Sequence, residues 1–476
     1  MPDSFDDAAA QVAWLPDFVY TNGRFESGTA LICGEGGRII GLAPEGETSA
    51  ARVVRLKNKA ALPGLVNAHS HAFQRVIRGR TERRTTGKDS FWTWRELMYS
   101  AATRLAPEEI YDASRMAFLE MALAGITSVG EFHYLHRAPD GSAYDDPNLL
   151  SKEVIRAARD TGLRICLLRV AYARSGYNTP PNERQKRFIE PEVDAYLRNV
   201  EDLRKDLAAG SSAVPSAWAG LAPHSVRAVP REYLLEVARF TEGKGGVPLH
   251  MHVAEQPAEV RACLEEHGRT PVEFLDDIGL LNQNFTGVHA IHITQEETRA
   301  LARAGANVCA CPTTERNLGD GIVPAEMLFA ENVPISLGTD SHAQIDLLED
   351  ARELEYHLRL QKLERAVLAP EDDASTSALA RRLFASATSS GARSINSPGG
   401  ELQTGSPADF FTVDLNDPSI AGASSDDLLS AVVFNLSRTA IRDVFVGGKQ
   451  IVSEGRHAGE GETVERFAAL QRKLWS

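Results

Sequence analysis

The stretch Leu62-Pro-Gly-Leu-Val-Asn-Ala-His69-Ser-His71 is an apolar run of strand length that ends in two histidines one residue apart. Side chains alternate along a strand, so His69 and His71 point to the same side, with roughly 6.6 Å of chain between them. One metal ion can bind both imidazoles at that spacing, although a lone pair of this kind is about as often two ordinary histidines. The rest of the sequence decides between these two interpretations.

Seven further apolar runs of similar length follow, with helical patterns such as 107–124 and 344–363 between them. Near-continuous apolar strands that alternate with helices are typical of a parallel sheet covered on both faces. Eight such strands predict a (β/α)8, or TIM-like, barrel. The predicted strands are 62–69, 126–133, 164–170, 217–224, 247–252, 285–292, 307–312 and 333–340.

Both ends of the chain carry short β-like segments broken by glycine-containing turns such as Asn22-Gly23. This pattern predicts that the two termini together build one small β-sandwich domain. The predicted fold is therefore α/β, with residues 1–63 and 395–476 in the small domain and residues 64–394 in the barrel. The β-like segments are 17–20, 30–33, 38–42 and 52–56 at the start, and 408–415, 432–434, 441–446 and 450–452 at the end.

The chain has 476 residues and a formal net charge of −14, from 51 Lys and Arg against 65 Asp and Glu. Because the acidic excess is scattered along the chain, it argues against a nucleic-acid or anionic-membrane partner. No stretch approaches the ~18 apolar residues of a membrane helix, and the first residues are acidic, unlike a signal peptide. Five cysteines, mostly far apart, fit reduced thiols better than disulfides, so we expect a cytoplasmic protein.

Metal-capable side chains recur where the predicted strands end, which is where active sites form in this fold. His252 and Asp340 end the fifth and eighth strands and should meet the paired histidines of the first strand at one rim. Three imidazoles and a carboxylate suit Zn²⁺ or another borderline divalent ion. His250 could compete with His252 for this role. Glu255 favours His252, because a carboxylate three residues beyond the ligand can reach a bound water as a general acid or base.

Two other patterns predict no additional site. Gly34-Glu-Gly36-Gly37 lacks the strand-then-helix context of a dinucleotide fingerprint and is better interpreted as a hairpin turn. Cys309 and Cys311 have no second cysteine pair nearby in the sequence, so they are expected to be small core residues of a strand.

Five segments that span nearly the whole chain resemble the amidohydrolase superfamily. In that superfamily a barrel holds one or two divalent metals, and both chain ends build a small sheet domain. The lysine that usually supports a second metal ends neither the third nor the fourth predicted strand, so the resemblance implies a mononuclear site. The segments are Leu62 to His71, Leu249-His-Met-His252-Val-Ala-Glu255, Val288-His289-Ala-Ile-His292, Leu337-Gly-Thr-Asp340-Ser-His342 and Val446-Gly-Gly-Lys-Gln-Ile-Val-Ser-Glu-Gly-Arg456.

Within the superfamily, further segments resemble the formimidoylglutamate deiminase family. The resemblance implies an enzyme that hydrolyses N-formimino-L-glutamate to N-formyl-L-glutamate and ammonia in histidine degradation. These segments are His71-Ala-Phe-Gln74-Arg, Phe91-Trp-Thr-Trp-Arg95-Glu, Val129-Gly-Glu-Phe-His133-Tyr134-Leu-His, Ala222-Pro-His224-Ser-Val-Arg227-Ala-Val and Cys311-Pro-Thr-Thr-Glu-Arg-Asn-Leu-Gly-Asp-Gly321.

The same resemblance implies a role for each candidate site residue. Arginines at the barrel mouth suit a substrate with two carboxylates, because a planar guanidinium binds a carboxylate bidentately. In the predicted mechanism zinc acidifies a water, Asp340 with His289 accepts its proton, and Glu255 protonates the imino nitrogen. The implied assignments are His69, His71, His252 and Asp340 to zinc, Glu255, His289 and Asp340 to proton transfer, and Gln74, Arg95, Tyr134, His224 and Arg227 to the substrate.

Two alternatives stay open at this point. One is another mononuclear-zinc aminohydrolase of the same barrel, a guanine- or adenosine-type deaminase, which would need contacts to a base in place of carboxylate-binding arginines. The other is a non-catalytic scaffold that has kept the fold and lost its metal. The ligand set would also hold Fe²⁺, Co²⁺ or Ni²⁺. Because members of the superfamily are often dimers, we expect a homodimer.

Overall fold

A computed structural model describes residues 11–47, 50, 52–82, 91–181, 183–210, 214–243 and 245–476, without the side chains of residues 91 and 92. The acidic start of the chain and the first two side chains of the 91–96 motif therefore lie outside the described residues. None of the described helices combines the length and the apolar character that a membrane crossing requires.

Eight parallel strands form the barrel, as the sequence predicted, and they pair in chain order. Every residue of seven of these strands is buried, and the eighth, β9, has one half-buried residue, Trp218. Strands covered on both faces read as unbroken apolar runs, which explains why the sequence located them well. The strands are β6 (Leu65–Ser70), β7 (Ile126–His133), β8 (Arg164–Ala171), β9 (Ala217–Pro223), β10 (Leu249–Val253), β11 (Phe285–His289), β12 (Asn307–Ala310) and β13 (Ile335–Leu337).

The barrel closes just beyond β13, against the end of β6. The Asp340 N–H donates to the His69 carbonyl at 3.0 Å, and the His71 N–H donates to the Asp340 carbonyl at 3.1 Å. Gly338 permits this close approach, because a Cβ there would lie 2.8 Å from the Cβ of His69. The backbone contacts that close the barrel therefore bring three polar side chains of the predicted site together.

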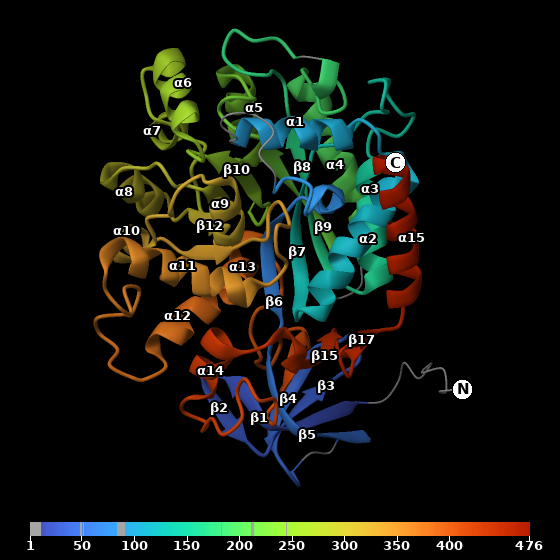
Figure 1. Cartoon of the computed structure of the whole chain (residues 1–476), viewed down its shortest axis with the longest axis vertical. Helices are drawn as coiled ribbons and strands as arrows, with labels where there is room; N and C mark the ends of the chain where they lie inside the picture. The colour runs from blue at the N-terminus through green and yellow to red at the C-terminus, as the bar shows by residue number, and fades with distance from the viewer. Residues whose placement is uncertain are drawn as a thin grey trace.

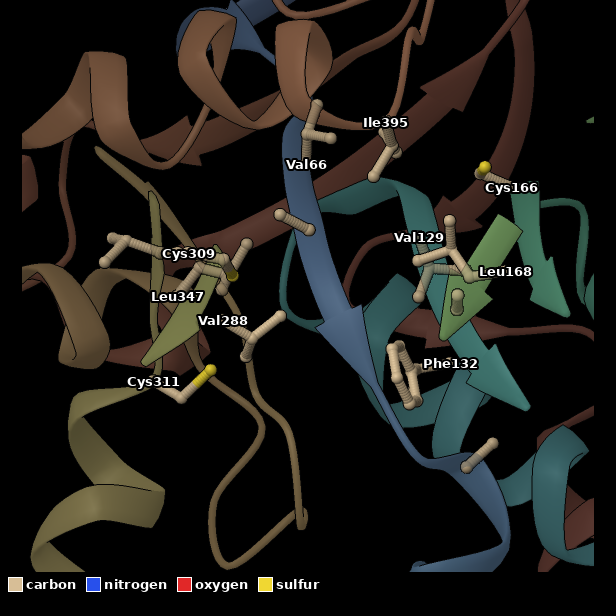
Figure 2. Close-up of a cluster of buried hydrophobic side chains, with 14 of the residues drawn as sticks. Val66, Val129, Phe132, Cys166, Leu168, Val288, Cys309, Cys311, Leu347 and Ile395 are labelled. Carbon is tan, nitrogen blue, oxygen red and sulfur yellow. The ribbon is translucent and has the colours of Figure 1, made fainter. Parts of the chain in front are cut away.

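Apolar side chains fill the interior of the barrel. Figure 2 shows Val66 of β6, Phe132 of β7, Leu168 of β8 and Val288 of β11 within one buried cluster. A packed interior of this kind leaves the ends of the strands, and not a central channel, as the place for a site.

Helices surround the barrel (Figure 1). α8 shows why they start and stop where they do: Thr294 and Glu297 cap each other's backbone N–H groups, and Gly305 ends the helix at a positive φ of 65°. The helices are α1 (Phe91–Ala102), α2 (Pro107–Leu123), α3 (Leu149–Thr161), α4 (Val193–Ala209), α5 (Arg231–Thr241), α6 (Pro257–His267), α7 (Pro271–Asp277), α8 (Gln295–Ala304), α9 (Pro312–Leu318), α10 (Ala325–Ala330), α11 (Leu347–Lys362), α12 (Ala378–Ser386), α13 (Ser389–Ser394), α14 (Leu428–Asn435) and α15 (Glu460–Trp475), with 3-10 turns η1 (Ala72–Ile77), η2 (Glu183–Gln185) and η3 (Arg438–Ala440).

Both chain ends build one small β domain, as predicted. Its nine described strands form one hydrogen-bonded sheet, in which β14 from the end of the chain pairs antiparallel with β5 from the start. Trp14, Phe410 and Phe445 pack together in its core, with the Phe410 and Phe445 rings stacked at 4.2 Å. The strands are β1 (Val12–Thr21), β2 (Arg24–Ser27), β3 (Thr29–Cys33), β4 (Ile39–Pro44), β5 (Arg52–Pro63), β14 (Phe410–Asp414), β15 (Ile441–Val446), β16 (Lys449–Ser453) and β17 (Arg456–His457).

One predicted strand of the small domain is wrong. Residues 432–434 lie in the helix α14, where Leu428, Leu429, Val432 and Val433 are buried at helical spacing. The sequence Val432-Val-Phe has high β propensity, but a short apolar run does not distinguish a strand from a turn of buried helix. Packing of α14 against α12 and α11 decides the outcome.

The small sheet lies at one end of the molecule and α1 at the opposite end, with the barrel between them (Figure 1). A buried ion pair joins the two parts: Arg164, the first residue of β8, donates to both carboxylate oxygens of Asp409 at 2.6 and 3.0 Å. Since β5 ends at Pro63 and α13 ends at Ser394, we propose boundaries after residues 63 and 394 for the two parts of the chain.

Candidate active site

Four side chains meet at the carboxyl ends of the barrel strands. His69, His71, His252 and Asp340 each offer one ligand atom, and these atoms all lie within 4.8 Å of one another. Nε2 of His69 lies 3.2 Å from Nε2 of His71, and the two nitrogens lie 3.4 and 3.2 Å from Oδ1 of Asp340. The cluster is buried and unites the residues that the sequence placed on the first, fifth and eighth strands.

Backbone carbonyls hold two of these imidazoles through their other nitrogen. Nδ1 of His71 donates to the Phe132 carbonyl at 2.9 Å, and Nδ1 of His252 donates to the His224 carbonyl at 3.1 Å. Each bond fixes the tautomer that leaves Nε2 with a lone pair facing the cluster. His250 is held elsewhere, because its Nε2 donates to the Ser394 carbonyl at 2.8 Å. His252, and not His250, therefore faces the cluster.

The backbone at this rim is strained. Ala254, His289, Ala290, Asp340 and His342 all have φ between 43° and 71°, although none is a glycine. Such conformations cost on the order of 1–3 kcal/mol each and concentrate where surrounding structure must hold a side chain in a required place. Two of the five, His289 and Asp340, are candidate catalytic residues.

The arrangement fits a divalent metal ion. Ligand atoms placed tetrahedrally around an ion at ~2.0–2.1 Å would lie about 3.3 Å apart, close to the separations of 3.2–3.4 Å among His69, His71 and Asp340. Burial lowers the pKa of His69 to about 3 and holds the pKa of His252 well below its ordinary value. Both imidazoles are therefore neutral at physiological pH, which is the form that binds a metal.

A second group of acid and base side chains borders the cluster. Nε2 of His289 lies 3.7 Å from Oε1 of Glu255 and 3.9 Å from Oδ2 of Asp340. Burial raises the pKa of Glu255, and the Asp340 carboxylate adds to this against the opposing effect of His289. The hydrogen bonds from the cluster histidines overcome burial at Asp340 and hold its pKa well below the ordinary range. One carboxyl group is thus biased toward its acid form and the other toward its base form.

Glu315 completes this second group, and the sequence analysis gave it no role. Its Oε1 lies 3.2 Å from Nδ1 of His289 and accepts the N–H of Cys311 at 2.8 Å. Burial alone would lower the pKa of His289, but Glu255, Glu315 and Asp340 together raise it well above its ordinary value. Cys311 directly follows β12, and Glu315 lies four positions further along the chain. A carboxyl residue this close to the end of a barrel strand is the signal that could have suggested a partner for His289.

All five candidate substrate residues line one pocket beside the cluster. Gln74, Arg95, Tyr134, His224 and Arg227 border it together with Glu255 and His289. The pocket is narrow, since the centre of a water molecule can occupy only about 40 Å³ of it. A ligand of this pocket must therefore be small, or must move the surrounding side chains.

The two arginines reach the pocket from different elements. Arg95 comes from α1, where its guanidinium carbon lies 5.5 Å from the centre of the Tyr99 ring. Arg227 follows β9, and its Nη1 donates to the Tyr172 hydroxyl at 3.3 Å. Tyr99 and Tyr172 also line the pocket, although the sequence analysis did not identify them. Apart from Tyr134, which the family resemblance assigned to the substrate, nothing in the sequence indicates which of the ten tyrosines face this space.

Cys311 lies close to the cluster without forming a cysteine site. Its Sγ lies within 4.8 Å of ligand atoms of His289 and Asp340, and Cys309 and Cys311 are both buried free thiols. Burial raises the pKa of Cys311 well above its ordinary value, which keeps the thiol protonated. Cys311 is buried, as predicted, but it lies just after the strand β12, which ends at Ala310.

A closed parallel barrel with a buried His and Asp cluster at the carboxyl ends of its strands is the architecture of a metal-dependent enzyme. The model of the amidohydrolase family matches residues 60–451 of the chain. The chain is 38% identical over 466 residues to a formimidoylglutamate deiminase from Pseudomonas aeruginosa, covering 98% of both sequences. It is 30% identical to an 8-oxoguanine deaminase from the same species, covering 96% of this chain and 97% of the other.

A crystal structure of an amidohydrolase from Brucella melitensis has the same fold, with a TM-score of 0.88 at 33% identity. That alignment covers 98% of this chain and 100% of the other. The chain belongs to the amidohydrolase family, and it is a hydrolase of a carbon–nitrogen bond.

Proposed function

We propose that this protein hydrolyses N-formimino-L-glutamate to N-formyl-L-glutamate and ammonia, a reaction of histidine degradation. The observation that carries this proposal is the 38% identity to a formimidoylglutamate deiminase over 98% of both chains. The 8-oxoguanine deaminase is also similar along its full length, but at 30% identity. A purine deaminase is therefore the alternative to exclude, and the complete cluster of His69, His71, His252 and Asp340 argues against a non-catalytic scaffold.

The charges in the pocket suit this substrate. N-formimino-L-glutamate carries two carboxylates, and Arg95 and Arg227 bring two guanidinium groups to the pocket wall. A purine ring has no carboxylate to pair with them. Two guanidinium groups in the wall of one pocket attract an anionic ligand more strongly than a neutral base.

Neutral groups of the pocket suit the formimino end of the substrate. Oε1 of Gln74 is buried and has no hydrogen-bond partner among the described residues, while its Nε2 donates to the Tyr134 hydroxyl at 2.8 Å. The free oxygen can accept an N–H of the formimino group. Burial raises the pKa of Tyr134 well above its ordinary value, so its hydroxyl remains a neutral partner.

The metal proposed for the cluster is one Zn²⁺ ion, held by His69, His71, His252 and Asp340. When bound, the ion is a Lewis acid that lowers the pKa of a water molecule towards ~7. No second metal is proposed, because no lysine ends the third or fourth barrel strand, which finish at Ala171 and Pro223.

The remaining chemistry consists of proton transfers by three side chains. Asp340 with His289 accepts a proton as the water oxygen attacks the formimino carbon, and Glu255 donates a proton to the imino nitrogen, which becomes NH₂. The proton taken from the water then passes from Asp340 and His289 to this nitrogen, which leaves as ammonia when the carbon–nitrogen bond breaks. The remaining hydroxyl proton passes to Glu255, which regains its acid form, and the formyl group of the product is left. The raised pKa of Glu255 keeps this proton available for donation.

We further propose that the protein is a cytoplasmic homodimer. All five cysteines are buried free thiols, which suits a reducing compartment. Light scattering of the purified protein tests the oligomeric state.

The direct test of the proposed function is ammonia release by purified, zinc-loaded protein. N-formimino-L-glutamate should be turned over, whereas guanine, 8-oxoguanine, adenosine and N-formiminoglycine should not. The matched variant is Arg227→Met, which keeps the bulk of the side chain and removes its charge. It should raise the KM for the dicarboxylate without loss of zinc. Turnover of a purine in preference to N-formimino-L-glutamate would refute the proposal.

A further inference from the structure

Two tyrosines in the pocket wall form a hydrogen-bonded group that no assignment above uses. The hydroxyls of Tyr99, from α1, and Tyr172, just after β8, lie 3.4 Å apart. Nε2 of Gln185 donates to both, at 3.2 and 3.0 Å, and Nη1 of Arg227 donates to Tyr172 at 3.3 Å. Both tyrosines and Gln185 are about 98–99% buried, since their exposed fractions are 2%, 2% and 1%.

The orientation of the Gln185 amide is fixed from its other side. The Ser175 hydroxyl donates to Oε1 of Gln185, which leaves Nε2 to face the two tyrosines. Each hydrogen of that NH₂ group is therefore directed at one phenol oxygen.

Counting donors and acceptors leaves one phenol hydrogen over. Each hydroxyl has one hydrogen and two lone pairs. Gln185 fills one lone pair on each tyrosine, Arg227 fills the second on Tyr172, and a bond from Tyr172 to Tyr99 fills the last. All four lone pairs are then used, and the hydrogen of Tyr99 has no acceptor among the described residues. The reverse bond, from Tyr99 to Tyr172, would need a third lone pair on Tyr172, because Gln185 and Arg227 already fill its two.

The unused hydrogen lies at the pocket, beside a cation. Both tyrosines line the pocket with Arg95 and Arg227. Burial raises the pKa of Tyr99, so this phenol stays protonated at neutral pH and can act as a donor. A buried donor next to a guanidinium calls for an anionic acceptor, and a carboxylate supplies one.

We propose that Tyr99 and Tyr172 act together as a specificity-determining pair that donates one shared phenol hydrogen bond to the substrate carboxylate held by Arg227. The inference rests on the proposed function, because it takes the ligand to be a formimino dicarboxylate. Either tyrosine can supply the hydrogen when the other is absent, since Gln185 still fills a lone pair on each.

If the two tyrosines share one hydrogen bond to the substrate, the KM values of the single and double variants should follow a pattern that a packing role would not produce. Tyr99→Phe and Tyr172→Phe should each raise the KM for N-formimino-L-glutamate by no more than about threefold. The double variant should raise it by about tenfold to a hundredfold, the loss expected for one hydrogen bond to a charged group, with kcat changed little. The Kd of the product N-formyl-L-glutamate, measured by calorimetry on the zinc-loaded protein, should change in parallel.

Two kinds of control accompany these variants. Tyr233→Phe changes a buried tyrosine of α5 whose hydroxyl has no hydrogen-bond partner in the described structure, and it should behave as wild type. N-formimino-L-2-aminobutyrate and 4-(formimino)aminobutyrate each lack one substrate carboxylate. The analogue without the carboxylate that meets Arg227 should have the same KM in the double variant and in wild type.

A double variant within about threefold of wild type, or single variants that account for the whole loss, would overturn the proposal while leaving the proposed function intact. If wild-type protein neither turns over N-formimino-L-glutamate nor binds N-formyl-L-glutamate, the proposed function fails and this inference fails with it. The two failures are distinguished by the wild-type measurement.

Discussion

Replacing Glu255 with glutamine removes the carboxyl proton that the mechanism delivers to the imino nitrogen, while the side chain keeps its shape. Among the residues that the structure describes, the carboxyl groups that line the pocket are those of Glu255 and Asp340. Asp340 is a proposed metal ligand with a pKa held well below its ordinary range, so it cannot replace Glu255 as an acid. His289 lies 3.7 Å from Glu255 but its Nδ1 is engaged by Glu315.

The expected loss follows from this assignment. A positioned general acid or base contributes typically 10²- to 10⁴-fold to a rate, so we expect kcat of Glu255→Gln to fall about 10³-fold, or ~4 kcal/mol in the barrier. Glu255 is not part of the cluster that offers ligand atoms, so zinc should stay at one ion per chain. The melting temperature should not fall, because an amide replaces a buried acid whose charged form is disfavoured there.

The assay is ammonia release at saturating N-formimino-L-glutamate, with zinc measured by atomic emission on the same sample. Glu265→Gln is the matched control, since it makes the same chemical change at an exposed position of α6 and should leave kcat unchanged. A Glu255→Gln variant that binds zinc and keeps kcat within about tenfold of wild type would refute the role of Glu255 as the proton donor.

Three other changes have defined outcomes. His252→Ala should lower bound zinc below one ion per chain and abolish turnover, as measured by atomic emission; full zinc content would exclude His252 as a ligand. Asp409→Asn leaves the buried charge of Arg164 without its partner and should lower the free energy of unfolding by about 3–5 kcal/mol in urea titrations, and a loss below 1 kcal/mol would contradict this. Burial and the nearby Arg169 lower the pKa of His136 from 6.5 to about 4, so the unfolded chain takes up its proton first. Its contribution is complete above pH 6.5 and is lost as the pH falls to 4, about 3 kcal/mol in all, and His136→Asn should remove this part of the pH dependence.

The barrel strands were predictable because a strand that is buried on both faces has an unbroken run of apolar residues in its sequence. β7, for example, spans Ile126–His133 as predicted. Polar sheet residues are harder to interpret: β5 runs from Arg52 to Pro63, although its first half is largely exposed and the prediction ended at residue 56. At residues 432–434 an apolar run led to the opposite error, because helix packing and not β propensity determines α14.

The metal cluster was predictable for a similar reason. Period-two spacing places His69 and His71 on one side of a strand, and strand ends converge at one rim, so His252 and Asp340 follow from the barrel. Glu315 and the tyrosines could not be placed in this way. They reach the site from α9, from α1 and from the residue after β8, and which face of a helix or loop meets the pocket depends on packing that one sequence does not display.

The central claim is that the terminal imino nitrogen leaves as ammonia, and labelling that nitrogen tests it most directly. Zinc-loaded protein would be incubated with N-formimino-L-glutamate carrying ¹⁵N at the imino position, and the products followed by NMR. The account predicts ¹⁵N-ammonium together with unlabelled N-formyl-L-glutamate, formed in equal amounts. Labelled formamide with free glutamate would show that the other carbon–nitrogen bond is cleaved, and would contradict the proton delivery assigned to Glu255.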